Sequence, residues 1–125
     1  MINSLYRISK SEVNTSGFEC EIVLNPDHEV YQAHFPGYPV TPGVVQLQIV
    51  EELIEQLQGL DLSLSKVSQC KFVHTVNPLE NELIRVRVEM KDRSINQAQL
   101  GVRVTITSAS GIHMEARVEY QVGVT

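Results

Sequence analysis

The sequence has no tryptophan, only two cysteines, and no apolar run long enough to cross a membrane. Cys20 and Cys70 are too few for a disulfide framework or a metal cluster, so we expect two buried thiols. A membrane-spanning helix needs about 20 apolar residues, and the first residues lack the apolar stretch of a signal peptide. We therefore expect a cytoplasmic chain that binds no membrane.

Positive charge is also scarce. Ten Lys and Arg residues against 15 Asp and Glu leave a net charge of −5 and a pI near 5.3. A nucleic-acid-binding surface must neutralise phosphates with basic side chains, so we expect no nucleic-acid partner. No pair of histidines has helical metal-ligand spacing, and we expect neither a metal nor a cofactor. With 125 residues, 42% of them hydrophobic, the whole chain 1–125 is expected to form one domain.

What the sequence does contain is a strong period of two. Segments 83–90, 99–107 and 112–122 place apolar residues at every second position, as does 18–24, while 62–73 has a weaker pattern. This period indicates strands with one buried and one wet face, which is typical of antiparallel sheets. We expect a hairpin at residues 110–111 and a turn within residues 92–96. In this phase His113 lies on the wet face.

One amphipathic helix is expected to interrupt the strands. Pro42-Gly43 opens it, Thr41 is the expected cap, and Gly59 ends it. Gln46 falls in the middle of the apolar arc, where it either lines a cavity or satisfies a backbone group. The order of strand, loop, single helix and four strands predicts an α+β fold. At 100° per residue the apolar arc comprises Val45, Ile49, Val50, Leu53, Ile54 and Leu57, and the polar arc Gln48, Glu51, Glu52 and Glu55.

The segment from His34 to Gly43 carries the chemistry. Its three prolines and two glycines exclude a helix or strand and indicate a loop of defined shape. The loop ends at a helix N-terminus, where free N–H groups and the helix dipole favour negative charge. This pairing suits a thioester enolate, because a base can remove a C2 proton while N–H groups hold the oxyanion. The alternative is a rigid connector whose histidine is only hydrogen-bonded in place.

The pattern His34-Phe35-Pro36-Gly37-x-Pro39-Val40-x-Pro42-Gly43-Val44 resembles the signature loop of the beta-hydroxyacyl-(acyl carrier protein) dehydratases. A weaker likeness extends over Lys71-Phe72, Val76 and Pro78. The resemblance implies a hot-dog fold, in which an antiparallel sheet wraps around one long central helix. It also implies elimination of water from a 3-hydroxyacyl thioester, giving a trans-2-enoyl thioester in fatty-acid or polyketide-type lipid biosynthesis.

The resemblance further assigns roles to residues of this loop. His34 is the implied catalytic base, the Gly43 N–H holds the thioester carbonyl, and the Val40 carbonyl orients the imidazole. Phe35 and Pro42 belong to the same implied substrate-binding loop. The implied partners are an acyl carrier protein that bears a 3-hydroxyacyl chain and a second protomer, in a homodimer, a larger oligomer or a heterodimer.

One position departs from the family pattern. Five residues after the last glycine of the motif the family has a glutamate or aspartate, and this chain has Gln48. An amide can hydrogen-bond a hydroxyl but cannot supply a proton as an acid does. Glu52 lies one turn further along the same helix face and is the candidate displaced acid. The alternatives are a non-catalytic hot-dog subunit that binds acyl carrier protein, and an acyl thioesterase.

The remaining basic and histidine residues have simpler interpretations. An acidic carrier protein needs a local basic patch on this acidic chain, and Arg85 with Arg87, or Lys66 with Lys71, could form one. His28 is expected to shape a polar turn. We expect His74, at a strand end, to be solvated together with His113.

Overall fold

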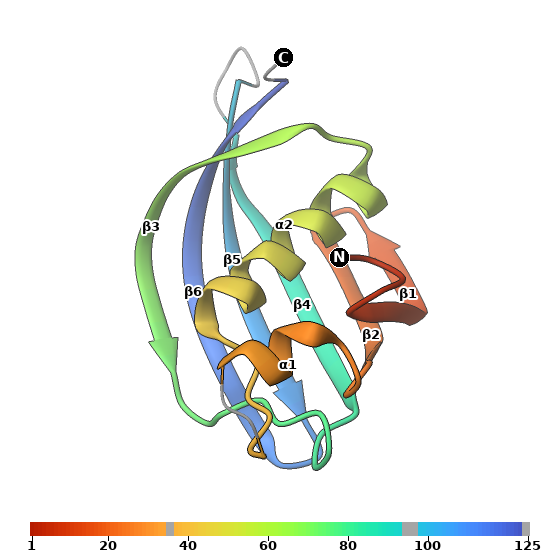
Figure 1. Ribbon diagram of the computed structural model, residues 1–125. Coiled ribbons are helices and arrows are strands. Elements are labelled where there is room, and N and C mark those ends of the chain that lie inside the picture. Colours follow the sequence, from red (N-terminus) through yellow and green to blue (C-terminus); the bar gives the residue numbers. More distant parts are fainter. Residues whose placement is uncertain (35–36, 94–97, 124–125) are drawn as a thin grey trace.

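The computed structural model describes residues 1–34, 37–93 and 98–123, and it has a six-stranded antiparallel sheet that curls around one long helix (Figure 1). The sheet order is β1-β2-β4-β5-β6-β3, so β1 and β3 are the two edges. This is the predicted α+β hot-dog architecture. The elements are β1 (Tyr6–Asn14), β2 (Gly17–Leu24), α1 (Glu29–His34), α2 (Gly43–Gln58), β3 (Leu62–Phe72), β4 (Leu83–Arg93), β5 (Gln99–Ser108) and β6 (Gly111–Val122).

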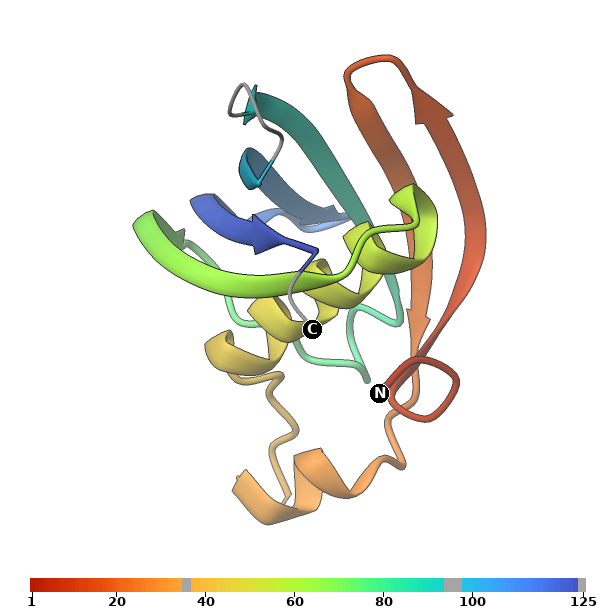
Figure 2. The same cartoon turned by 90° about the horizontal axis from the view of Figure 1, so that it is seen from above.

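The alternating strands build the core as predicted. Helix α2 lies along the concave face of the curled sheet (Figure 2). Val86, Val104 and Val118 are completely buried. Their neighbours Arg85, Arg87 and Arg103 are exposed on the convex face. Burying one face against the helix and wetting the other fixes the strand register, because a one-residue slip would reverse every side chain.

Helix α2 also has the predicted faces. Its buried residues are those of the apolar arc together with Gln46, and Leu57 is partly buried. The helix ends at Gly59, whose φ of 66° is left-handed and whose N–H donates to the Glu55 carbonyl at 3.0 Å. The predicted Thr41 cap is wrong. Pro42 occupies the cap position without a side-chain hydrogen bond, and the Thr41 hydroxyl pairs with Tyr31 instead.

Two elements were not predicted from the sequence. Strand β1 is exposed over most of its length, so it has no clear alternation of buried and wet residues. Helix α1 has only six residues, too few for a 3.6-residue period to be recognised. Of the turn expected within residues 92–96, residues 92 and 93 belong to β4, and 94–96 lie outside the described residues.

The predicted exposure of His113 is wrong. The pairing of β5 with β6 shifts register between Ile106 and Thr107, because Ile106 pairs with Met114 while Thr107 pairs with Ile112. His113 is the extra residue of this β-bulge, and it is 1% exposed. Such a bulge reverses the phase of the strand beyond it. The ring nitrogens of His113 lie 2.6 Å from the Ser108 hydroxyl and 3.1 Å from the Thr75 carbonyl.

Among the helices in the described ranges, none is both long and apolar enough to span a bilayer.

Candidate active site

The candidate site begins where α1 ends. His28 shapes the start of this helix, since its Nδ1 accepts a hydrogen bond from the Val30 N–H at 3.0 Å, as expected of a turn residue. His34 is the last residue of α1. Its side chain, together with Phe35 and Pro36, lies outside the described part of the chain. The backbone is described again from Gly37, whose φ of 85° is a conformation that favours glycine.

Thr41 is the best-anchored residue between the two helices. Only 2% of it is exposed. Its N–H donates to the Val76 carbonyl at 2.8 Å, and its Oγ1 lies 2.9 Å from the Tyr31 hydroxyl. Its carbonyl accepts a hydrogen bond of 3.1 Å from Gln46 Nε2. All three polar groups of Thr41 are therefore engaged, each by a different segment of the chain.

The N-terminus of α2 presents backbone donors. Pro42 makes no side-chain cap, and the first turn holds no acidic side chain. The first helical carbonyl in use is that of Pro42, which accepts from the Gln46 N–H at 3.0 Å. The N–H groups of Gly43 and Val44 belong to the first turn, whose donors have no partner within the helix and suit an oxyanion.

Phe72, at the end of β3, lies over Gly43. A Cβ placed on Gly43 would come within 2.5 Å of the Phe72 Cζ atom, so the aromatic ring fills the space that a side chain would need. Half of Phe72 is still exposed. The resemblance that includes both the Gly43 motif and Lys71-Phe72 therefore concerns two segments that meet in space.

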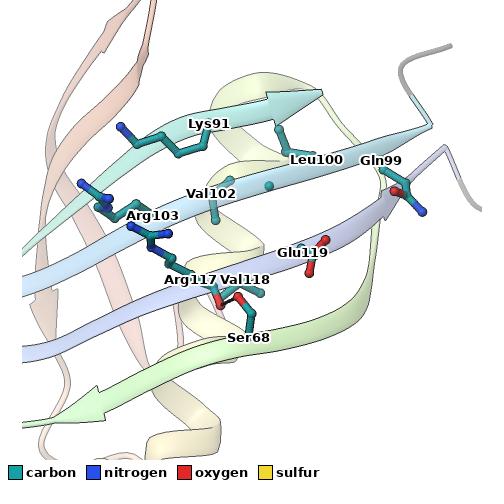
Figure 3. Close-up of a pocket in the computed structure, with 10 residues that line it drawn as sticks. Ser68, Lys91, Gln99, Leu100, Val102, Arg103, Arg117, Val118 and Glu119 are labelled. Atoms are coloured by element: carbon teal, nitrogen blue, oxygen red, sulfur yellow. Dashed lines mark hydrogen bonds between the residues drawn. The ribbon is translucent and has the colours of Figure 1, made fainter. Parts of the chain in front are cut away.

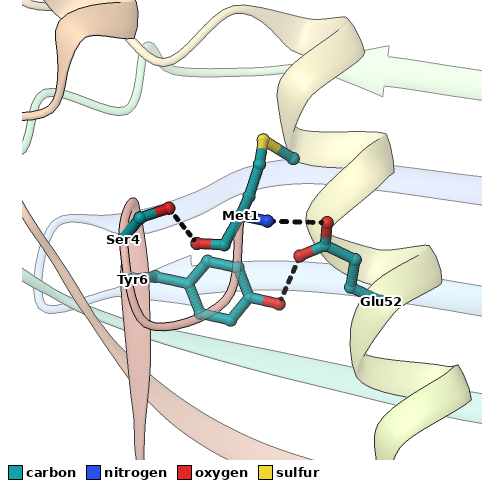
Figure 4. Close-up of polar contacts among 4 residues, drawn as sticks. All are labelled: Met1, Ser4, Tyr6 and Glu52. Atoms are coloured by element: carbon teal, nitrogen blue, oxygen red, sulfur yellow. Dashed lines mark hydrogen bonds and ion pairs between the residues drawn. The ribbon is translucent and has the colours of Figure 1, made fainter.

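Gln48 and Glu52 differ in their surroundings. Gln48 is exposed, five residues after Gly43 and roughly 7–8 Å further along the helix axis. Glu52 lies about 13 Å along the axis from Gly43. Its Oε1 accepts a 2.9 Å hydrogen bond from the Tyr6 hydroxyl and its Oε2 lies 3.3 Å from the Met1 amine (Figure 4). Within one chain, the carboxylate is thus turned toward β1 and the N-terminal segment.

Electrostatics around Glu52 follow from this contact. Burial, followed by the hydrogen bond to Glu52, raises the pKa of the Tyr6 phenol well above its ordinary value. The neighbouring Glu51 also has a raised pKa, first because of burial and then because of the charges of Glu55 and Glu52. Tyr6 therefore stays a neutral donor, and its bond holds the Glu52 carboxylate in place.

The basic residues suggested for carrier docking divide into two groups. Arg85 pairs with Glu19 at 3.3 Å and Glu21 at 2.9 Å, and Arg87 lies 3.8 Å from Glu89. Lys66 and Lys71 are exposed on β3 and have no carboxylate within 4 Å in the described part of the chain. The β3 pair is therefore the less neutralised of the two.

One hollow of the described surface lies away from the helix terminus. A shallow depression of about 630 Å³ lies on the convex face, where Lys91, Arg103 and Arg117 project from neighbouring strands (Figure 3). Its position on the sheet face opposite α2 separates it from Gly43, so it does not belong to the candidate active site. The described residues contain no group of three or more His, Cys, Asp and Glu side chains that could hold a metal ion.

Sequence reasoning identified one part of the Thr41 anchor and missed another. The position of Gln46 within the apolar arc left two interpretations open, a cavity lining or a backbone partner near the loop, and the structure shows that its amide holds the Thr41 carbonyl. Gln46 also borders a small apolar space with Ile49, Val76 and Ile106. Nothing in the sequence indicated Tyr31, because α1 was not predicted.

The curled sheet and the central helix define a protein of the hot-dog fold. The family model described as "ApeI-like: ApeI dehydratase" matches residues 9–110. The chain therefore belongs to the ApeI-like dehydratase family.

Two curated relatives are similar to this chain. The 3-hydroxyacyl-(acyl-carrier-protein) dehydratase FabZ of Levilactobacillus brevis is 36% identical over 83 residues, which are 60% of this chain and 55% of the relative. The protein of the same name from Latilactobacillus sakei subsp. sakei is 32% identical over 90 residues, covering 66% and 60%. The match thus spans less than two thirds of either relative.

Solved structures share the fold. The dehydratase heterocomplex ApeI:P from Xenorhabdus doucetiae superposes with a TM-score of 0.66 at 17% identity, covering 91% of this chain and 96% of that one. A hypothetical thioesterase protein with coenzyme A from Streptococcus pneumoniae TIGR4 gives a TM-score of 0.63 at 13% identity, covering 94% and 84%. Identities this low show a common fold alone and carry no conclusion about activity.

Proposed function

We propose that this chain is a 3-hydroxyacyl thioester dehydratase that acts on acyl groups carried by an acyl carrier protein. The observation that carries the proposal is the His34–Gly43 motif, which ends at a helix N-terminus without a side-chain cap in a member of a dehydratase family. A histidine base and free backbone donors are the two groups that enolate chemistry needs.

In the proposed reaction the His34 imidazole removes a proton from C2 of the thioester. The Gly43 N–H donates a hydrogen bond to the thioester oxygen, where negative charge develops, and the Val40 carbonyl orients the imidazole. The electron pair from C2 then forms the C2–C3 double bond as the C3 hydroxyl leaves. This hydroxyl must take up one proton, so that water is released and the product is the trans-2-enoyl thioester.

Two groups can return that proton. Glu52 is the displaced-acid candidate, and His34 is the other because it holds the proton taken from C2. The contact of Glu52 with Tyr6 and its distance along α2 favour His34. Gln48, which is exposed and closer to the helix N-terminus, would then hold the leaving hydroxyl by its amide. Phe35 and Pro42 complete the proposed substrate-binding loop.

A non-catalytic subunit is the second candidate. Gln48 stands where the family has an acid, Glu52 is engaged with Tyr6 and Met1, and the first turn of α2 holds no acidic side chain. The structural neighbour ApeI:P is itself described as a heterocomplex. In this version the chain would bind the carrier protein or complete the site of another protomer. A thioesterase remains the third alternative.

The test is turnover of a 3-hydroxyacyl thioester, followed by enoyl absorbance. The parent chain should form the enoyl product, and His34→Ala should lose at least about 10²-fold in kcat, the usual size of an acid–base contribution. His74→Ala is the matched control, since His74 is exposed and should leave kcat unchanged.

Two further variants separate the proton donors. Glu52→Gln should keep kcat within about threefold if His34 returns the proton, whereas a loss of about 10²-fold or more would establish Glu52 as the acid. An inactive parent whose Gln48→Glu variant gains turnover would contradict the dehydratase proposal and support the non-catalytic subunit.

A further inference from the structure

Thr41 connects three segments that are distant in sequence or belong to different elements. Tyr31 comes from α1, Gln46 from the first turns of α2, and Val76 from the connection between β3 and β4. Their hydrogen bonds to Thr41 measure 2.9, 3.1 and 2.8 Å. Thr41 and Tyr31 are both buried, at 2% and 3% exposure, so water does not compete for the bond between their hydroxyls.

These bonds constrain both ends of the signature loop. Tyr31 precedes His34 by three residues on α1, which is nearly one helical turn. Thr41 precedes Gly43 by two residues, and the intervening Pro42 has its φ fixed at −59°. The bond between the two hydroxyls therefore ties the end of α1 to the start of α2 through short, stiff segments.

The Gln46 amide has one useful orientation. Its Nε2 donates to the Thr41 carbonyl, and its Oε1 has no hydrogen-bond partner among the described residues. Turning the amide over would bring two oxygens together, so the buried amide is committed to holding Thr41. In this orientation the buried Oε1 has no partner in the described part of the chain, which is unfavourable. The amide nevertheless keeps the hydrogen bond from its Nε2 to the Thr41 carbonyl.

We propose that Thr41 is a positioning residue, held by Tyr31 and Gln46, that fixes the end of α1 relative to the Gly43 N–H. The inference rests on the proposed function, because it concerns the same site. Burial raises the pKa of Tyr31, so the phenol remains protonated at neutral pH and keeps its hydrogen for the bond. Thr41 touches no reacting atom in this account. It acts by keeping the base and the oxyanion donor at one separation.

The experiment compares variants that keep or lose the hydroxyl pair. Thr41→Val and Tyr31→Phe remove one hydroxyl each with little change of shape, and Thr41→Ser restores the hydroxyl. Tyr120→Phe is the matched control, because it removes a buried tyrosine hydroxyl on β6, outside the signature loop. Two quantities are measured: kcat and KM on a 3-hydroxyacyl thioester, and hydrogen exchange of the Thr41 and Gln46 amides.

We expect Thr41→Val and Tyr31→Phe to lower kcat by about 10- to 100-fold, the cost of misplacing a catalytic group by about 1 Å, with KM changed less than twofold. The double variant should be no worse than either single variant, because both remove one bond. Thr41→Ser and Tyr120→Phe should stay within about threefold of the parent. The backbone N–H groups of Thr41 and Gln46 should exchange faster in Thr41→Val and Tyr31→Phe. The backbone N–H of Val104, in the core of β5, should keep its exchange rate.

The outcomes separate this inference from the proposed function. An inactive parent would contradict the dehydratase proposal, and the amide exchange would still decide the role of Thr41. Parental exchange rates at Thr41 and Gln46 in Thr41→Val would overturn the inference. Equal loss of kcat in Thr41→Val and Thr41→Ser would also overturn it, since only the former lacks the hydroxyl.

Discussion

The two thiols of this chain differ in their environments although both were expected to be buried. Cys20, on β2, is 2% exposed, and burial followed by the charge of Glu19 raises its pKa to about 12. Cys70, on the edge strand β3, is only partly buried, and burial raises its pKa as well. Because the thiolate is the reactive form, these positions should differ in reactivity.

Labelling with a thiol-specific disulfide reagent at pH 8 tests this difference. With a pKa of about 12, only about one Cys20 thiol in 10⁴ is ionised at pH 8, against roughly a quarter for an ordinary thiol of pKa 8.5. One thiol should therefore react in the folded protein, and the second only after denaturation. In Cys70→Ser the folded protein should not react. Two fast thiols in the folded parent would contradict the described burial of Cys20.

At the residue scale, the sequence was most informative where a residue type was unusual for its expected position. Gln46 stood out because an amide in an apolar arc is unusual, although its role stayed open between a cavity lining and a backbone partner. Gly59 was recognisable because a helix end favours a left-handed residue. His113 was placed on the wrong face because a one-residue bulge leaves no mark in an alternating pattern. Tyr31 was not recognised because its partner, the Thr41 hydroxyl, was assigned to a helix cap.

At the scale of elements, the turn between β1 and β2 depends on Gly17. Its φ is +151°, and a Cβ there would collide with the carbonyl oxygen of Val88 on the neighbouring strand β4. Gly111, the first residue of β6, also has a positive φ of 112°, but a Cβ there would meet open space. At Gly17 a side chain would clash with a neighbouring strand, whereas at Gly111 only the backbone conformation disfavours a side chain.

Alanine at the two positions should give unequal losses of stability. Gly111→Ala should lower the free energy of unfolding by about 1–2 kcal/mol through backbone conformation alone. Gly17→Ala should lose at least twice as much, because the obstructing atom is backbone and cannot move away without disturbing β4. Urea unfolding measures both, and the transition midpoint should fall without a change in slope. Equal losses would show that β4 yields to the added methyl group.

Among the elements, those with a continuous buried face were predicted most clearly, β3 was predicted from a weaker pattern, and β1 and α1 were not predicted. β2, β4, β5 and α2 each bury a continuous apolar face, and their sequence periods gave their bounds to within a few residues. β1 and α1 receive their shape from their neighbours. β1 follows the backbone of β2, and α1 is fixed through His28 and Tyr31. A single-sequence period cannot report such long-range partners.

At the scale of the whole molecule, the two edges of the sheet differ in character. β1 exposes the charged residues Arg7, Lys10 and Glu12, which discourage pairing with another strand. β3 exposes Leu64, Val67 and Phe72, and its outer backbone groups face away from β6. Phe72, the last residue of β3, lies over Gly43, so an assembly through β3 would place the candidate site near the interface.

We predict that the chain is at least a dimer at micromolar concentration and that β3 is the edge involved. Leu64→Lys combined with Val67→Lys should lower the sedimentation coefficient without unfolding the protein, because both side chains are exposed in the single chain. Val13→Lys, an equally exposed position on β1, should have no effect. A monomeric parent would contradict the prediction, and a response to Val13→Lys alone would assign the contact to β1.

The sheet order has a consequence for how the chain matures during its synthesis. In the described sheet β3 has β6 as its neighbouring strand, and the residues opposite it, such as Met114 opposite Phe72, are translated long after it. Until residues 111–122 have left the ribosome, the apolar side chains of β3 have no neighbouring strand on either side. The nascent chain therefore passes through a stage in which α2 is complete but its cover is not, a state prone to mispairing with other chains. The sheet is therefore complete only after β6 has emerged and paired with β3.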